Sequence, residues 1–404
     1  MGSKTLNDIF YKPDIGASGA VEKGKFDDGL DDADILIESN KPVNNKLSAF
    51  AVTTSEELAG VISDKTGSGA LVFETALNDR TTQTTEDYTI YCNASTGNDI
   101  TGDGTSGNPY ATIQKCIDML PTIIAHNVII AVGADETVTT AISFAGHYCG
   151  KSLTLKAMDI SDNNLYFSGT ATGGSATTLT QTGAGWAIDF WNGGYVFIWK
   201  GTGVGEVREI TNTTSDTITI ASGTTPDNTS KYVIVKVTIT GSSINNCIEA
   251  PLDNLYIQGF KFTGATKYAI RTDEAGSSGT GIHTLDVKYN LIQTPFGIRI
   301  AAYKSAKVWE CYINADSGKN GLFVASMSYC YIRDSVIKGA GIGVNATSNS
   351  MVLMVNTVPN TFIDLATGIK ALMGSIVQNG SSMTFVSCST DLDPAAASDP
   401  AFIG

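Results

Sequence analysis

VKYNLIQTPFGIRI, residues 287–300, contains the two short patterns that decide the fold we predict. The first pattern, VKYNLI, begins and ends with an apolar residue and holds polar residues in between. The second pattern, GIRI, places apolar residues directly after a glycine. Each pattern alone is typical of a short β-strand bounded by a turn.

Both patterns recur in the same order along the chain, at starts about 20 to 30 residues apart. A coil of that length with short strands and turn glycines is what a parallel β-solenoid requires, because no coil buries its apolar face alone. Like residues of successive coils then stack about 4.8 Å apart. The alternative is a β-sandwich whose strands resemble one another by chance, which does not explain why the patterns alternate. The further copies are IQGFKF (257–262), VWECYI (308–313) and IRDSVI (332–337) for the first pattern, and AIRT (269–272), GLFV (321–324), GIGV (341–344) and GIKA (368–371) for the second.

The composition agrees with an all-β fold and argues against several partners. The 404 residues include 42 glycines, and only 16% are charged, which suits short strands and polar turns. The net charge of −14, from 26 basic and 40 acidic residues, argues against a nucleic-acid or anionic-membrane partner. No apolar run reaches the roughly 18 residues of a membrane-spanning helix, so we expect no membrane insertion.

The residues that commonly bind metals do not occur at the spacing of a metal site. The seven cysteines are far apart and form no C-x-x-C, so we expect buried thiols in a protein made in a reducing compartment. Asp99 and Asp103 match two positions of a calcium loop, but Tyr110 stands where the bidentate glutamate belongs. We therefore predict a tight turn there, no metal and no cofactor.

A short helix is predicted where the solenoid starts. Asn108 can cap it, Pro109 suits its first position, and Pro121 ends it. We interpret it as a capping helix, because an open solenoid end exposes apolar core and unpaired strand edges. The apolar residues that share one helix face are Ile113, Cys116, Ile117 and Leu120.

These patterns divide the chain into five segments. The module at 162–236 is dense in β-branched and aromatic residues, and we predict a small antiparallel barrel or sandwich inserted between two coils. Its Trp186, Trp191 and Trp199 are more typical of core than of a ligand platform. The segments are an extended N-terminal region (1–87), the β-helix start with its capping helix (88–161), the inserted module (162–236), about five coils (237–390) and a C-terminal tail (391–404).

Three stretches resemble known families. YTIYCNASTGNDITGDGTSGNPYATIQKCIDMLP, residues 88–121, resembles the opening of pectate-lyase-like right-handed parallel β-helix proteins, which is frequent in phage tailspikes. TSEELAGVISDKTGSGALVF, residues 54–73, is similar to a segment near the N-terminal half of phage tail fibres. TLTQTGAGWA, GGYVFI and GEVREITN, within 162–236, are similar to a small β module of phage structural proteins. Together the resemblances cover roughly half of the chain.

This resemblance implies a bacteriophage tailspike or tail fibre, which is made in the host cytoplasm and located in the tail of the virion. It implies a homotrimer whose N-terminal region, residues 1–87, attaches to an adaptor or nozzle protein of the tail. It also implies that the β-helix recognises a polysaccharide on the host surface. Threefold assembly would cover an exposed apolar face of the solenoid, and the extended N-terminal region would become ordered on the virion.

The repeat also predicts which side chains line up on the outside. Aromatic rings offer flat faces to sugars, and charged groups bind sugar hydroxyls. The candidate glycan-binding residues are therefore Lys288, Tyr289, Trp309, Tyr312 and Arg333. Four of them belong to two adjacent outward rows, and Tyr312 lies near these rows. The first row is Gln258, Lys288, Trp309 and Arg333, and the second is Gly259, Tyr289, Glu310 and Asp334.

Three functions remain open at this point. A pure adhesin needs no catalytic group, and we favour it because no polygalacturonase-like or lyase-like residue set is present. A depolymerising tailspike, either a glycoside hydrolase or a polysaccharide lyase, is the alternative. Its candidate catalytic residues are Glu310 and Asp334, which adjacent coils would place about 5 Å apart, as in a retaining glycosidase. The third function is a purely structural tail adaptor. The aromatic residues would then pack on a neighbouring subunit, and the charges would pair.

Overall fold

The computed structural model describes residues 83–272, 283–301, 304–354, 360–379, 383–394 and 402–403. The chain divides into two compact units, Met1–Phe73 and Glu74–Gly404, and all described residues belong to the second. The predicted N-terminal attachment region, up to residue 82, therefore lies outside the described residues. Among the described residues, no helix has the length and apolarity that a bilayer crossing requires.

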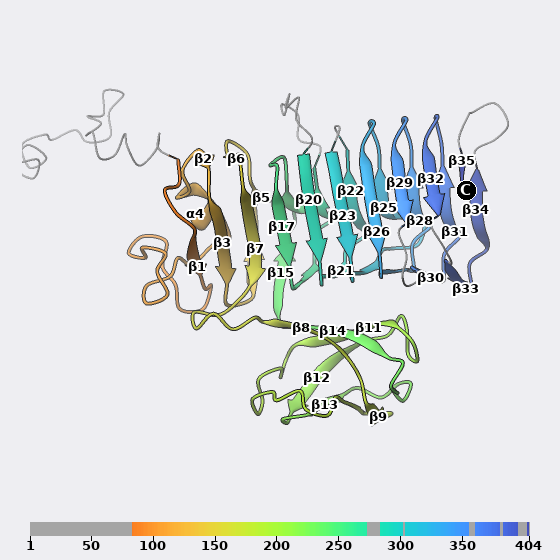
Figure 1. The fold of residues 1–404 in the computed structure, drawn as a ribbon, viewed down its shortest axis with the longest axis horizontal. Helices are drawn as coiled ribbons and strands as arrows, with labels where there is room; N and C mark the ends of the chain where they lie inside the picture. The colour runs from red at the N-terminus through yellow and green to blue at the C-terminus, as the bar shows by residue number, and fades with distance from the viewer. Residues whose placement is uncertain are drawn as a thin grey trace, which may run out of the picture. The chain divides into compact units, whose positions relative to one another are not determined.

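The second unit is built on a parallel β-solenoid of about ten turns, which confirms the predicted parallel β-helix. Three strands of each coil pair with their counterparts in the next coil and so form three parallel sheets (Figure 1). The first sheet contains β1 (Tyr88–Cys92), β3 (Asn127–Val132), β7 (Ser152–Ala157), β17 (Leu255–Gln258), β20 (His283–Lys288), β23 (Lys304–Trp309), β26 (Tyr329–Arg333), β29 (Met351–Met354), β32 (Ile376–Asn379) and β35 (Phe402–Ile403).

The other two sheets have eight strands each within the described residues. The second sheet contains β4 (Glu136–Val138), β15 (Val237–Gly241), β18 (Phe260–Thr263), β21 (Leu291–Gln293), β24 (Tyr312–Asn314), β27 (Val336–Lys338), β30 (Thr361–Ile363) and β33 (Thr384–Val386). The third contains β5 (Ile142–Ser143), β16 (Asn246–Glu249), β19 (Tyr268–Arg271), β22 (Phe296–Ile300), β25 (Asn320–Val324), β28 (Ile342–Ala346), β31 (Thr367–Ala371) and β34 (Thr390–Pro394). A small parallel pair, β2 (Ile123–Ile124) and β6 (Tyr148–Cys149), lies near the start.

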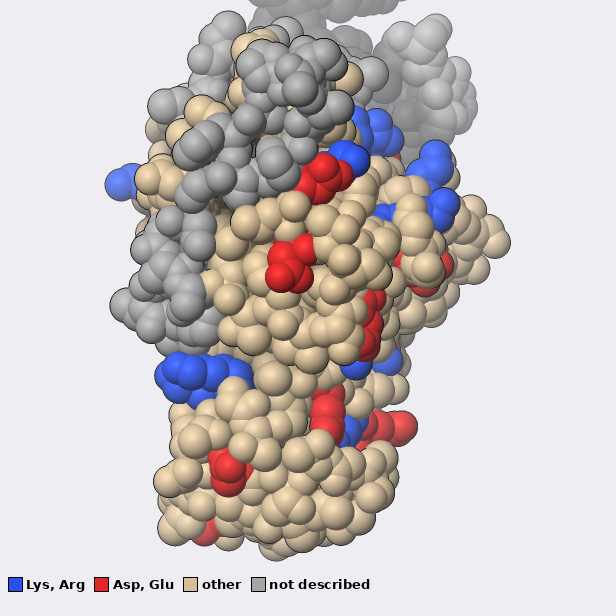
Figure 2. Space-filling model, turned by 90° about the vertical axis from the view of Figure 1, so that its right-hand side faces the viewer, with Lys and Arg blue, Asp and Glu red and all other residues tan. Residues whose placement is uncertain are grey.

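The solenoid core consists of stacked apolar side chains. Leu155, Ile257, Val287, Val308 and Ile332 occupy one register position in successive strands of the first sheet, and each is fully buried. Because the side chains of a strand alternate between two faces, the residues beside them point outward. The sequence repeat therefore reflects the stacking of like residues in successive coils. Most of the side that Figure 2 presents is uncharged, and charges of both signs are scattered over it.

The capping helix is present, as α4 (Ile113–Asp118), but it begins later than predicted. Thr112, rather than Asn108, is its N-cap residue, with an extended backbone (φ −119°, ψ 148°). The Thr112 hydroxyl accepts a hydrogen bond from Lys115 N at 3.2 Å. The Asn108 amide instead donates to Thr101 O at 2.8 Å and closes the preceding loop.

The aspartates of that loop bind backbone and hydroxyl groups. Asp99 Oδ1 accepts from Ala111 N and Thr112 N at 2.8 and 3.0 Å, and its Oδ2 accepts from the Thr112 hydroxyl at 2.8 Å. Asp103 Oδ1 accepts from Thr105 N at 2.9 Å. Both carboxylates therefore hold the turn that leads into α4.

The inserted module is a seven-stranded antiparallel sheet with the order β8-β14-β11-β12-β13-β10-β9. It is inserted into the solenoid between β7 of the first sheet and β15 of the second. Trp186 and Trp191 are buried in its own core, as predicted. The strands are β8 (Tyr166–Thr170), β9 (Gly173–Ser175), β10 (Thr178–Thr180), β11 (Tyr195–Lys200), β12 (Val207–Thr213), β13 (Thr217–Ile220) and β14 (Lys231–Val235).

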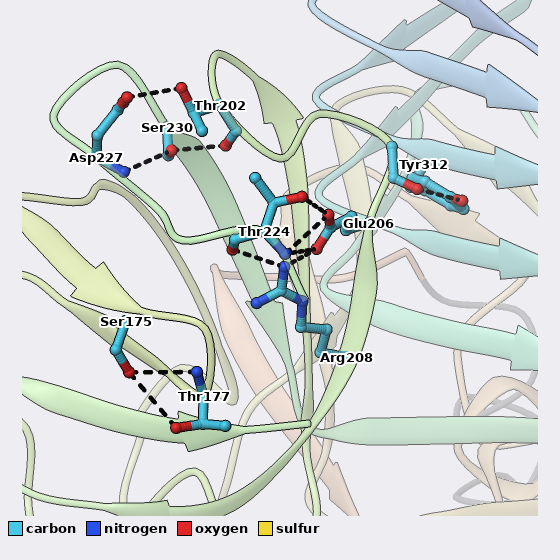
Figure 3. Close-up of polar contacts among 10 residues, drawn as sticks. Ser175, Thr177, Thr202, Glu206, Arg208, Thr224, Asp227, Ser230 and Tyr312 are labelled. Carbon is cyan, nitrogen blue, oxygen red and sulfur yellow. Dashed lines mark hydrogen bonds and ion pairs between the residues drawn. The ribbon is translucent and has the colours of Figure 1, made fainter. Parts of the chain in front are cut away.

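The insert packs on the outer face of the second sheet. The Tyr312 hydroxyl of β24 donates to Gly205 O, in the turn before β12, at 3.0 Å (Figure 3). Beside this turn, Arg208 is buried in an ion pair with Glu206 and donates to Thr224 O at 2.9 Å. The apolar contact joins Phe197, Trp199, Val233 and Val235 of the insert to Leu291, Tyr312, Val336 and Ile363 of the second sheet.

Candidate functional site

The outer face of the first sheet carries the row of side chains that the repeat predicts. Strand pairing aligns each of its members with the next: Lys156, Gln258, Lys288, Trp309 and Arg333. Neighbouring members are one coil apart, about 4.8 Å. The row therefore runs along the axis of the solenoid, and Trp309 lies between Lys288 and Arg333.

A second row on the same face was missed from the sequence. It contains Tyr256, Asp286, Lys307 and Tyr331, which pair in successive coils. Each of them lies two residues before a member of the first row, and side chains two apart on a strand share a face. The alternation in LDVK, AKVW and CYIR carries this signal, because each of these strands has two outward positions.

Trp309 is surrounded by cations. The charged groups of Arg333, Lys307 and Lys288 lie 5.2, 5.3 and 5.9 Å from the centre of its ring. Such cation–π contacts hold a half-exposed ring in place and are each worth about 0.5–1 kcal/mol. The indole Nε1 is buried and donates to no described residue. Trp309 therefore offers a fixed, partly exposed ring face.

Asp286 provides an acceptor on the same face. Its Oδ1 is buried and accepts from no described residue. Burial raises the pKa of this carboxyl, and the nearby Lys307 and Lys288 oppose the rise. An unpaired buried carboxylate oxygen is costly unless a donor reaches it. We call Asp286, Lys288, Lys307, Trp309 and Arg333 the Trp309 patch.

The corner between the first and second sheets carries the other predicted row. Gly259, Tyr289, Glu310 and Asp334 all have positive φ, at 86°, 60°, 50° and 52°. This left-handed backbone turns the chain from one sheet to the next. Asn290 stabilises the corner after β20, because its amide donates to Ile257 O and Lys288 O, both at 2.9 Å.

The insert contacts two of these corner residues. The Tyr289 ring stacks on Tyr166 of β8 with centroids 5.3 Å apart. Glu310 Oε2 accepts from the Ser168 hydroxyl at 3.1 Å. Both side chains therefore help to hold β8 against the solenoid, and both remain partly exposed.

Asp334 and Tyr312 are buried. Asp334 is only 3% exposed, and its Oδ2 accepts from Arg333 Nε at 2.7 Å. Tyr312 is also 3% exposed, because the insert covers the second sheet. The sequence-based expectation of a sugar contact at Tyr312 thus does not fit its position. The insert makes this residue part of an internal contact.

The two candidate catalytic carboxyl groups lie on adjacent coils but differ in exposure to solvent. Glu310 N donates to Arg333 O at 3.2 Å, so Glu310 and Asp334 occupy neighbouring coils as expected. A retaining hydrolase needs both carboxyl groups at the scissile bond. Here Asp334 is enclosed and paired with Arg333, and only Glu310 keeps partial exposure. Among the described residues, no cluster of three or more His, Cys, Asp or Glu side chains forms a metal site.

No family model matches the chain, and no curated protein matches it. Several solved structures are similar to it. One is the complex of XylC with xylose, with a TM-score of 0.34, 10% identity and coverage of 74% of this chain and 66% of that one. Another is the Pseudomonas phage phi297 tailspike gp61, with a TM-score of 0.18, 11% identity and coverage of 70% and 66%.

A third is the Gp54 tailspike of Acinetobacter baumannii bacteriophage AP22 in complex with A. baumannii capsular saccharide, with a TM-score of 0.20, 9% identity and coverage of 67% and 61%. The chain thus spans 61 to 66% of the length of these structures. Similarity at these identities and TM-scores carries no argument about function, which has to come from the chain's own residues.

Proposed function

We propose that this chain is a tailspike or tail fibre of a phage virion, and that it binds a host-surface glycan through the Trp309 patch. The sequence resemblances at 54–73, 88–121 and within 162–236 support the virion assignment. The parallel β-solenoid agrees with them. Adhesion is the preferred activity.

The observation that carries this proposal is one fixed, partly exposed aromatic ring that has three cationic side chains around it on the outer face of the first sheet. A sugar presents apolar C–H groups on its ring face and hydroxyls that both donate and accept. Trp309 offers the ring face, and Asp286, whose side chain is partly exposed, offers a carboxylate acceptor. The ammonium groups of Lys288 and Lys307 offer donors.

Depolymerisation is the second candidate, and the adjacency of Glu310 and Asp334 is what favours it. The burial of Asp334 opposes it, because a polymer would have to displace the Arg333 ion pair to reach that carboxyl. Incubation of the full chain with host polysaccharide tests it. Release of reducing ends or unsaturated products, lost in Glu310→Gln, would establish turnover. If the polymer stays intact, adhesion remains the proposed activity.

Two parts of the proposal concern assembly. We propose a homotrimer that attaches to the tail through residues 1–87, most of which lie outside the described residues. Light scattering of the purified chain gives the subunit number, and a mass other than that of three chains contradicts the trimer. A structural adaptor, the third candidate, predicts binding to a virion protein and to no glycan.

The glycan proposal is tested with Trp309→Ala on an array of host-surface polysaccharides. Buried aromatic anchors of an interface are worth about 2 kcal/mol or more, so we expect affinity to fall about 30-fold. Tyr148→Ala is the matched control, because Tyr148 is an aromatic residue that is 65% exposed on β6, outside the first sheet. Unchanged binding by Trp309→Ala would remove the patch from the proposal.

A further inference from the structure

A cavity of about 430 Å³ lies where the chain leaves the solenoid for the insert and returns to it. Its walls come from the turn after β3, from the segments before β8 and β15, and from the loop before β11. This volume falls within the range of small-molecule sites, about 300–1,000 Å³. The chemistry-bearing residues among its lining are Asp135, Asp159, Phe190, Asn192 and Lys236.

Lys236 is the central polar group of this cavity. Its ammonium lies 5.0 Å from the centre of the half-buried Phe190 ring and donates to the Phe190 carbonyl oxygen. That bond uses one of three ammonium donors. Burial lowers the pKa of Lys236, and the charges of Asp159 and Asp135 oppose the decrease. The ammonium is thus held beside a ring face with donor capacity remaining.

The other polar residues differ in what they have left to offer. Asp159 accepts from Ser161 N and Asn163 N at 2.8 and 2.9 Å, so its Oδ1 serves a turn. Asn192 is occupied as well, since it donates to Asp189 Oδ1. Asp135 is exposed, its Oδ1 accepts from Thr238 N at 2.7 Å, and its Oδ2 accepts from no described residue.

We propose that this cavity binds one neutral sugar unit. The Phe190 ring supplies the apolar face, Lys236 the donors and Asp135 the acceptor. The cavity holds two carboxylates against one ammonium, so an anionic sugar is disfavoured. The site is separate from the Trp309 patch, because β7 and β20, the nearest strands of the first sheet on the two sides, are two steps apart, roughly 10 Å. It stands whether or not the patch binds glycan.

The test uses the full chain with the methyl glycosides of glucose, galactose and mannose, and with glucuronate. Binding is measured by saturation-transfer NMR and calorimetry. We expect at least one neutral glycoside to bind, glucuronate to bind more weakly, and Lys236→Met to lower affinity at least tenfold. Lys267→Met is the matched control, because Lys267 is exposed outside the cavity. Trp309→Ala must leave this binding unchanged.

Asp135→Asn is the second variant, because an asparagine oxygen still accepts from Thr238 N and so preserves the local fold. It should lower the affinity for the neutral glycoside less than Lys236→Met does. It should also reduce the ratio between the affinities for the neutral glycoside and for glucuronate. The proposal is overturned if no neutral glycoside binds, or if Lys236→Met and Asp135→Asn, both folded by circular dichroism, bind like the unmodified chain. It is also overturned if Trp309→Ala abolishes the binding.

Discussion

Glu136 makes the stability of the capping helix depend on pH. It stands at the start of β4, is 7% exposed, and its Oε2 accepts a hydrogen bond from Ile113 N of α4 at 3.0 Å. Burial raises the pKa of this carboxyl from 4.5 to about 7. The hydrogen bond from Ile113 opposes that rise, and the charge of Asp99 adds to it.

The direction of the effect follows from proton linkage. A carboxyl with a higher pKa in the folded state binds its proton more tightly there than in the unfolded chain. Stability is therefore greatest below pH 4.5 and falls as the pH rises to about 7. A shift of roughly 2.5 units corresponds to about 3 kcal/mol. Glu136→Gln removes the ionisation but keeps an acceptor for Ile113 N.

We therefore expect Glu136→Gln to stabilise the capping helix by up to about 3 kcal/mol at pH 8. At pH 5 we expect the same variant to change the stability of this helix little. The ends of a solenoid open locally, so the assay is native-state hydrogen exchange of the α4 amides, corrected for intrinsic rates. Glu86→Gln, at an exposed position near the same end, is the control. The reasoning fails if the pH dependence of α4 persists in Glu136→Gln, or if that variant is less protected at pH 8.

The insert and its contact with the solenoid give two further predictions. Glu206→Gln removes the partner of the buried Arg208, and we expect a loss of about 3 kcal/mol, read as earlier thermal melting of the near-ultraviolet signal of the insert tryptophans. A melting curve that matches the unmodified chain would contradict it. Gly259→Ala places a Cβ 2.2 Å from the Tyr166 ring at a φ of +86°, so β8 must shift, and we expect a loss of at least about 2 kcal/mol in urea unfolding. Gly107→Ala, whose Cβ meets nothing within 4 Å, is its control, and equal losses in both variants would refute the steric account.

The solenoid was predictable where residues of like kind stack without interruption. The register of Ile257, Val287, Val308 and Ile332 appears directly as the first sequence pattern. The coil that contains β7 was not visible as a repeat, because the insert separates β7 from β15. About five coils were expected after the insert, and the structure has six complete ones between β17 and β34. The last coil, from β32 to β34, carries neither pattern, so one coil was missed.

The environment of the candidate site was less predictable. Only Gly259 marks the left-handed corner in the sequence, and Tyr289, Glu310 and Asp334 adopt the same backbone as ordinary residues. No local signal in the chain says that a module inserted after β7 will pack on β21, β24, β27 and β30. That long-range contact, and not the composition of the rows, buries Tyr312.

The way the insert is held bears on how the Trp309 patch would bind. Leu291 and Val336 of the second sheet are fully buried beneath the insert, so its detachment would expose them to water. The Tyr289–Tyr166 stack and the Glu310–Ser168 hydrogen bond fasten its edge at the corner beside the patch. The solenoid face that carries the patch and the edge of the insert beside it are thus both fixed before any ligand arrives. A site of this kind loses little conformational entropy on binding, so short glycan fragments should retain measurable affinity. A site that formed only around a long polymer would not bind them.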